Sequence, residues 1–157
     1  MRAASLNGGA SSAIASVDEA SASKYRLDDQ IGFILRQASQ RHAALFAERF
    51  GALTATQWAA LSKLAEVGAT SQNLLGRLTS MDVATINGVI DRLSRKGLVS
   101  STADRSDARR RLLDLTVSGR TLVAEMTAAA HEVTCETLAP LSPRESATFL
   151  ALLRRLT

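Results

Sequence analysis

The stretch DVATINGVIDRLSRKGL, residues 82–98, decides the fold of this chain because it predicts a helix with a sharply divided surface. Four apolar residues recur at helical spacing and form one face: Val83, Ile86, Ile90 and Leu93. The residues that lie away from this face are small, polar or charged: Ala84, Thr85, Asn87, Gly88, Asp91 and Arg92. We expect a helix over 82–96, ended by Gly97, whose outer face suits the edges of DNA bases and whose Asn87 can pair with an adenine.

A shorter helix precedes this stretch. It follows Thr70 and carries Leu74, Leu75 and Leu78, and only residues 79–81 separate it from the helix at 82. So short a connection is typical of a helix-turn-helix, in which the second helix enters a major groove.

A charged loop follows the stretch. The runs 98–100 and 112–115 flank the polar segment 101–111, and this pattern predicts a β-hairpin, or wing. Four arginines of the loop can lie along phosphates or enter a minor groove: Arg105, Arg109, Arg110 and Arg111. We expect Asp107 to hold Arg109 through a charge-assisted pair that fixes the direction of the wing.

The basic charge of the chain is concentrated around this loop. The 157 residues contain 19 lysines and arginines against 15 acidic residues, a net charge of +4. Residues 92–111 hold seven basic and two acidic side chains, so the remaining residues together carry about −1. A basic patch on a nearly neutral body indicates a polyanionic partner, although a solvated charged loop would have the same composition.

The rest of the chain is predicted to be mostly helical. Apolar spacing favours helices over 28–50 and 117–138, and a capping box at Thr54 and Gln57 opens another that ends near Gly68. A sixth helix opens at Ser142, and residues 1–24, rich in Ala, Ser and Gly, are expected to form a flexible arm.

Composition excludes several classes of protein. Cys135 is the single cysteine, so neither an intramolecular disulfide nor a cysteine-based zinc finger can form. No signal peptide or apolar run of membrane-spanning length is found, and we expect a cytoplasmic protein with no membrane partner. We do not expect an enzyme, because a glycine-rich phosphate loop and a nucleophile elbow are both missing.

Residues 53–119 resemble the MarR family of transcriptional regulators. The resemblance lies in the Leu53-Thr54 start, the run 82–98, the Asp107-Ala-Arg109 of the wing and the Leu115-Thr116-x-x-Gly119 that follows it. It implies a mostly α winged helix-turn-helix with a small β-hairpin wing. It also implies a domain over 25–157, in which 54–116 form the DNA-binding lobe and 28–50 and 117–157 form dimerisation helices.

The resemblance also implies how DNA is bound. Two lobes of a homodimer would read the half-sites of a pseudo-palindromic operator, with Ser80, Thr85 and Asn87 in the major groove and Arg109 in the minor groove. The chain departs from the family at Ala108 and Gly88, where relatives often carry arginine, and Arg110 and Arg111 can compensate for the first. The resemblance also implies repression, which is the usual action of the family.

Members of the family often bind small aromatic acids between the dimerisation helices and the lobe. Here the candidate ligand-binding residues are His42, Phe46, Arg49 and Trp58. Their rings and guanidinium can enclose and neutralise a flat carboxylate. The alternative is structural: Trp58 completes a hydrophobic staple with Leu53, and His42 packs in the core. Residues 32–42 and 71–73 resemble the branch associated with aromatic or nicotinate-like acids. No other cofactor is expected.

Other interpretations stay open of what the protein senses and of whether it binds a ligand at all. His131 and Cys135, with Glu132 and Glu136 beside them, offer two metal ligands on one helical face, although two ligands do not make a site. Redox sensing through Cys135 is a second possibility. An architectural DNA binder without a ligand, or a winged helix that binds only protein, is a third.

Overall fold

The computed structural model describes residues 25–51, 53–103 and 111–157. The chain divides into two units, residues 1–37 and 38–157. The predicted arm over 1–24 lies outside the described residues. Among the described residues, no helix is both long enough and apolar enough to cross a membrane.

The first helix begins later than the apolar spacing suggested. Residues Leu27–Asp29 form a 3-10 turn (η2), Gln30 is extended with ψ 127°, and helix α1 runs over Ile31–Phe50. The expected start at Asp28 was therefore wrong. The backbone N–H groups of Asp29 and Gln30 donate to carbonyls three residues back, those of Arg26 and Leu27, and this closes a separate turn before the helix.

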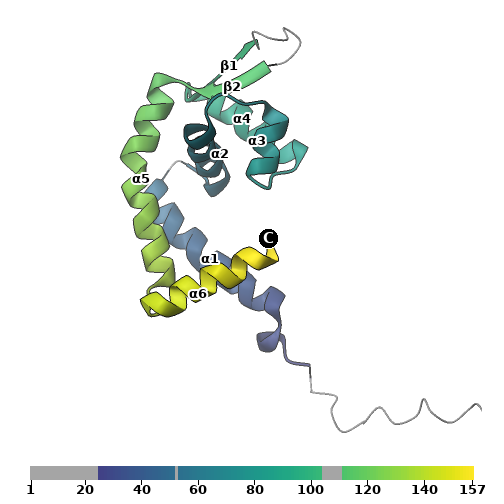
Figure 1. Ribbon diagram of the computed structural model, residues 1–157, viewed down its shortest axis with the longest axis vertical. Helices are drawn as coiled ribbons and strands as arrows, with labels where there is room; N and C mark the ends of the chain where they lie inside the picture. Colours follow the sequence, from purple (N-terminus) through teal and green to yellow (C-terminus); the bar gives the residue numbers. More distant parts are fainter. Residues whose placement is uncertain (1–24, 52, 104–110) are drawn as a thin grey trace, which may run out of the picture. The chain divides into compact units, whose positions relative to one another are not determined.

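The second unit contains the winged helix. Helices α2 (Ala55–Val67), α3 (Gln72–Leu78) and α4 (Val83–Arg95) are followed by strands β1 (Val99–Ala103) and β2 (Arg111–Leu115). The strands pair antiparallel, with Val99 opposite Leu115 and Ala103 opposite Arg111. Figure 1 shows α2, α3 and α4 gathered beside this hairpin.

Two long-range bonds attach the hairpin to the helices. The N–H of Thr70 donates to the carbonyl of Leu113 at 3.0 Å, and the N–H of Leu113 returns the bond at 2.8 Å. Beneath them lies an aliphatic core in which Leu61, Leu64, Leu75 and Leu93 are fully buried. The base of the wing is therefore held by these two hydrogen bonds and by the aliphatic core.

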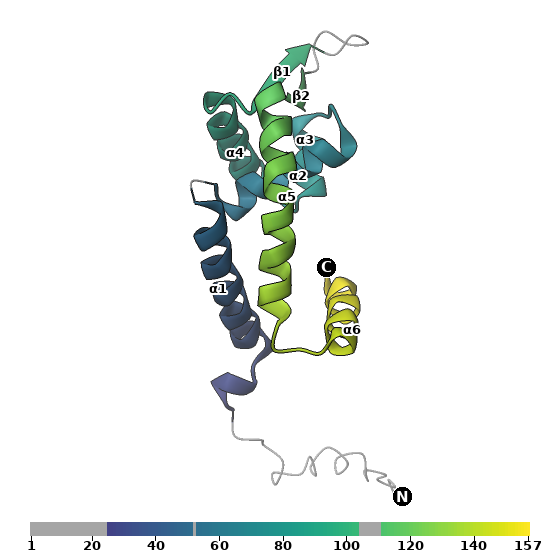
Figure 2. The ribbon, with the colours of Figure 1, turned by 90° about the vertical axis from the view of Figure 1, so that its left-hand side faces the viewer.

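Two further helices complete the chain: α5 (Val117–Leu138), which begins directly after β2 (Figure 2), and α6 (Pro143–Leu153), followed by a 3-10 turn, η3 (Arg154–Leu156). The predicted capping box at the start of α6 is present, with Ser142 and Glu145 bonded to each other's backbone N–H. Phe149, Leu152 and Leu156 leave an apolar face of α6 and η3 exposed.

One residue that we expected in the buried apolar stripe of α4 is exposed instead. Ile86, Ile90 and Leu93 are buried, but Val83 is 68% exposed and Val89 is buried instead. At 100° per residue, Val89 and Val83 lie at opposite edges of the stripe, and the edge that faces the core is the one that carries Val89.

Candidate nucleic-acid interface and ligand site

A tight turn joins α3 to α4. Asp82 caps α4 by accepting the N–H of Thr85 at 2.7 Å, and the N–H of Met81 donates to Gly76 at 2.9 Å. Among the described residues, Ser80 is the one non-glycine residue with a positive φ, +53°. The turn thus holds the exposed Ser80 in a conformation that few side chains adopt without strain.

The cap is ionised at neutral pH. Hydrogen bonds from the backbone of Thr85 hold the pKa of Asp82 below its ordinary value. A carboxylate whose pKa is lowered by folding stabilises the fold above its unfolded pKa and stops doing so as the pH falls through its folded pKa. The start of α4 is therefore fully capped near pH 7.

The outer face of α4 presents the residues that the sequence singled out. Ala84, Thr85, Asn87 and Arg92 are exposed, and Gly88 is half-buried. A Cβ placed on Gly88 would lie 3.8 Å from the Nη2 of Arg92, an ordinary contact distance, so the surface at 88 has room for a small group. The face is shallow at 84 and 88, which lets a base edge come close to the helix.

One partner on this face was not predicted. Gln72, at the start of α3, donates from Nε2 to the Oδ1 of Asn87. The two residues are 15 apart in sequence, and only the packing of α3 on α4 brings them together. Composition and spacing hold no signal for such a pair.

The base of the wing is described, but its tip is not. Arg111 is tied across the hairpin, with Nε donating to the Ser101 hydroxyl and Nη2 to the Ser101 carbonyl, both at 2.8 Å. Arg105, Asp107, Arg109 and Arg110 lie outside the described residues, so the Asp107–Arg109 pair stays a prediction.

A compact joint connects the wing to α5. Thr116 donates its N–H to Leu98 at 3.1 Å and its hydroxyl to Gly97 at 2.7 Å, and the same hydroxyl accepts the N–H of Gly119 at 3.0 Å. A Cβ on Gly119 would fall inside the carbonyl oxygen of Leu98. The Leu115-Thr116-x-x-Gly119 pattern thus seats the start of α5 directly on the end of α4.

Four rings form a row along α1 and α2. The ring centroids are 6.4 Å apart for His42 and Phe46, 4.0 Å for Phe46 and Phe50, and 4.9 Å for Phe50 and Trp58. Phe46 and Phe50 are buried, while His42 and Trp58 are half-buried. Phe50 thus connects Trp58 to the predicted pair His42 and Phe46. Nothing in its residue type or spacing distinguishes Phe50 from other core residues.

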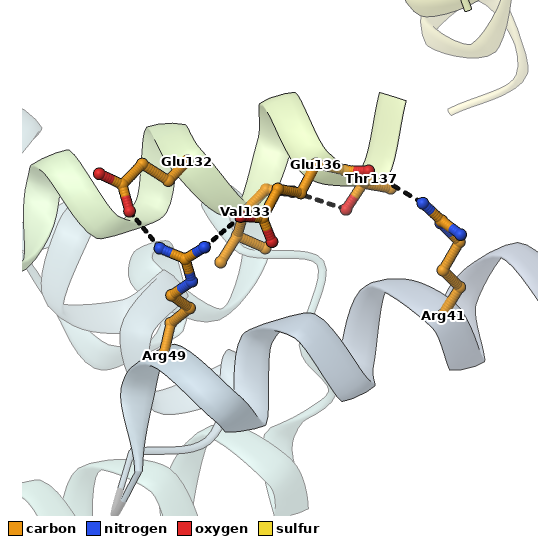
Figure 3. A network of polar contacts seen from close by, with 6 residues as sticks. All are labelled: Arg41, Arg49, Glu132, Val133, Glu136 and Thr137. Carbon is orange, nitrogen blue, oxygen red and sulfur yellow. Dashed lines mark hydrogen bonds and ion pairs between the residues drawn. The ribbon is translucent and has the colours of Figure 1, made fainter. Parts of the chain in front are cut away.

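Hydrogen bonding fixes the tautomer of His42. Its Nδ1 lies 3.0 Å from the Oγ1 of Thr137, and that hydroxyl donates to the carbonyl of Val133 at 2.7 Å (Figure 3 shows the second bond). Since a threonine hydroxyl has one proton, it can only accept from His42. Nδ1 therefore carries a proton, and in the tautomer with a single ring proton Nε2 is an acceptor that has no partner among the described residues.

Arg49 contacts α5. As Figure 3 shows, it pairs with both Glu132 and Glu136, and Arg41 donates to the Glu136 carbonyl at 3.1 Å. His42, Phe46 and Arg49 share one helical face by spacing, but the charge of Arg49 is already balanced by two carboxylates. An acidic ligand would have to compete with them.

The metal hypothesis gains no support from the surroundings of its two ligands. His131 and Cys135 are exposed, and the neighbouring Glu132 and Glu136 are engaged by Arg49. Within the described ranges, no three metal-ligating side chains come together.

Comparison with known proteins agrees with this fold. Residues 53–110 match the MarR family. The chain is 34% identical over 134 residues to the HTH-type transcriptional repressor NicR of Pseudomonas putida, covering 84% of this chain and 85% of that protein. The sequence resemblance to the family is confirmed, and with it the winged helix-turn-helix fold class.

Two solved structures are also similar. A probable transcriptional regulator from Pseudomonas aeruginosa has a TM-score of 0.82 and 56% identity, over 84% of this chain and all of the other. BpsR of Bordetella bronchiseptica, whose DNA binding is regulated by 6-hydroxynicotinic acid, has a TM-score of 0.80 and 38% identity, over 84% of this chain and 96% of its own. The chain therefore belongs to the MarR family and is a DNA-binding transcriptional regulator, not an enzyme.

Proposed function

We propose that two copies of this chain bind a pseudo-palindromic operator, repress transcription from it in the cytoplasm, and leave it when a small hydroxylated aromatic acid binds beside His42. The proton on Nδ1 of His42 supports the ligand part most directly, because it leaves Nε2 to accept from a ligand hydroxyl or ring N–H. BpsR, regulated by 6-hydroxynicotinic acid, suggests the class of ligand.

The DNA surface combines the turn, the outer face of α4 and the wing. Ser80, Thr85 and Asn87 would contact the major groove, with Ala84 and Gly88 giving base edges access and Arg92 reaching a phosphate. Arg109, oriented by Asp107, would enter the minor groove, and Arg105 and Arg110 would contact phosphates. Arg111, bonded to Ser101, would mainly stiffen the base of the wing.

The dimer would be formed by residues 28–50 and 117–157, which flank the DNA-binding lobe over 54–116. A single chain leaves large apolar side chains exposed near both of its ends: Ile31, Ile34, Leu35, Phe149, Leu152 and Leu156. Exposed apolar residues in such numbers favour burial against a second copy. Two lobes related by a two-fold axis would reach half-sites about one helical turn apart.

Release would begin at Arg49. A ligand carboxylate near His42 and Phe46 would compete with Glu132 and Glu136 for the Arg49 guanidinium and so weaken the attachment of α1 to α5. Because α5 begins at the wing joint, where Thr116 bonds to Gly97 and Leu98, a shift of α5 would move the wing relative to the DNA.

Replacing His42 by phenylalanine should separate ligand response from DNA binding. The variant keeps a ring next to Phe46 but loses Nε2, so we expect affinity for DNA within about twofold of the unaltered protein. The 6-hydroxynicotinate concentration for half-release should rise about tenfold or more, because a ligand donor is left without its hydrogen-bond partner. Fluorescence anisotropy with DNA from the protein's own promoter region measures both.

The matched control is His131→Phe, which changes the other histidine of the chain, an exposed one on α5. Its release curve should match that of the unaltered protein. The ligand proposal fails if benzoate, 4-hydroxybenzoate, nicotinate and 6-hydroxynicotinate all leave the DNA complex intact. It also fails if H42F responds as the unaltered protein does, and unfolding of H42F would assign His42 a structural role.

A further inference from the structure

We propose that Gln72 sets which base Asn87 reads, although Gln72 belongs to α3 and not to the recognition helix. Gln72 donates from Nε2 to the Oδ1 of Asn87, and Asn87 is exposed on the side of α4 that also carries Ala84 and Asp91. This inference rests on the proposed DNA contact of Asn87. It adds a specificity-determining residue that makes its effect through a neighbour.

The hydrogen bond from Gln72 distinguishes the oxygen of the Asn87 side-chain amide from its nitrogen. An asparagine that reads adenine uses both ends, since Oδ1 accepts from N6 and Nδ2 donates to N7. Here the bond from Gln72 holds Oδ1 toward α3, while Nδ2 has no partner among the described residues, so the amide is oriented with its donor end available to a base. A donor matches the acceptor-rich edges of guanine, with N7 and O6, or thymine, with O4.

The surroundings favour this orientation. Gln72 is half-buried and is held in place by the Ser71 cap, whose hydroxyl accepts the N–H of Leu74 at 3.3 Å. Gly88, next to Asn87 in sequence, has no side chain that could compete for the amide. Bound DNA would exclude water from this face. The hydrogen bond between the Gln72 and Asn87 amides would then strengthen, because water no longer competes for it.

The test is selection of bound duplexes from a random-sequence pool by the full-length protein, followed by sequencing. The unaltered protein should select guanine or thymine at one position in each half-site, and Asn87→Ala should abolish the preference at that position. Gln72→Ala should leave other positions unchanged. Because the Asn87 amide could then turn to present both Oδ1 and Nδ2, the preference for adenine over guanine at that position should rise about tenfold.

A second variant reverses the bond. In Gln72→Glu the side chain can only accept, so Nδ2 of Asn87 should turn toward it and Oδ1 should face outward. The same position should then favour adenine or cytosine, which present an amino group, while overall affinity falls because of the added negative charge. Asn73→Glu, exposed on the same helix, adds the same charge as a control and should not change the preference.

Three outcomes would overturn the inference: Q72A and Q72E keep the base preference of the unaltered protein, they change a position that N87A does not, or N73E changes the preference as Q72E does. Selection of no sequence by the unaltered protein would instead show that the proposed function itself is wrong. Circular dichroism of each variant establishes that the fold is intact.

Discussion

Replacing Gly119 by alanine should lower the free energy of unfolding by about 3 kcal/mol or more, at the upper end of the usual cost of overpacking. The new Cβ would overlap the Leu98 carbonyl oxygen, 3.1 Å from the Leu98 carbonyl carbon and 3.3 Å from Cδ2 of Leu115. The carbonyl cannot easily turn away, because it accepts the N–H of Thr116. Urea denaturation followed by circular dichroism measures the loss.

The matched control is Gly88→Ala, the same change within another helix. Its Cβ would meet only the Nη2 of Arg92 at 3.8 Å, an ordinary contact. Because alanine favours helix over glycine, the variant should be more stable by up to about 1 kcal/mol. Equal stabilities of G119A and G88A would contradict the packing described for the wing joint.

Replacing Arg109 by alanine should weaken DNA binding about 10- to 100-fold at moderate salt, the usual cost of losing one arginine contact. The expectation comes from the family resemblance of the wing and from its concentration of basic side chains. Arg111→Ala should cost less, since Arg111 is bonded to Ser101. Anisotropy titrations with promoter-region DNA compare the variants.

Arg144→Ala serves as the control for charge alone. Arg144 is exposed on α6, outside the proposed DNA surface, and its loss removes the same unit charge as R109A. We expect it to change affinity less than about twofold, because a distant exposed charge is screened by salt. Unchanged affinity of R109A would show that the wing does not act as proposed.

The features that depend on neighbours in sequence were predicted well. The capping boxes at Thr54 and Ser142 are present, and Gly51, Gly68 and Gly97 have the positive φ expected of helix ends. The hairpin and the limits of α5 also agree with expectation. Caps, turns and helical spacing are local, so the sequence expresses them directly.

The discrepancies arise where tertiary packing or local alternatives decide. Helical spacing alone predicted that Val83 is buried like Ile86. Val83 is exposed, because the end of the helix extends beyond the core that buries its middle. At the start of α1, bonds to residues three positions back closed a 3-10 turn over residues that were also compatible with α-helix.

The least predictable part of the candidate site is which polar side chains pair with one another. Arg49 pairs with Glu132 and Glu136 across more than 80 residues, and Gln72 meets Asn87 across two helices. The sequence identified Arg49 and Asn87 from their residue types and positions. It could not identify their partners, because many carboxylates and amides are chemically equivalent until the fold selects one.

The most direct test of the account is the salt dependence of binding to duplex DNA from the protein's own promoter region. If the wings and the start of each α4 neutralise about six phosphates, the logarithm of the association constant should fall with the logarithm of salt concentration at a slope of about −5. Binding that does not respond to salt would contradict the phosphate contacts on which the proposed operator recognition depends.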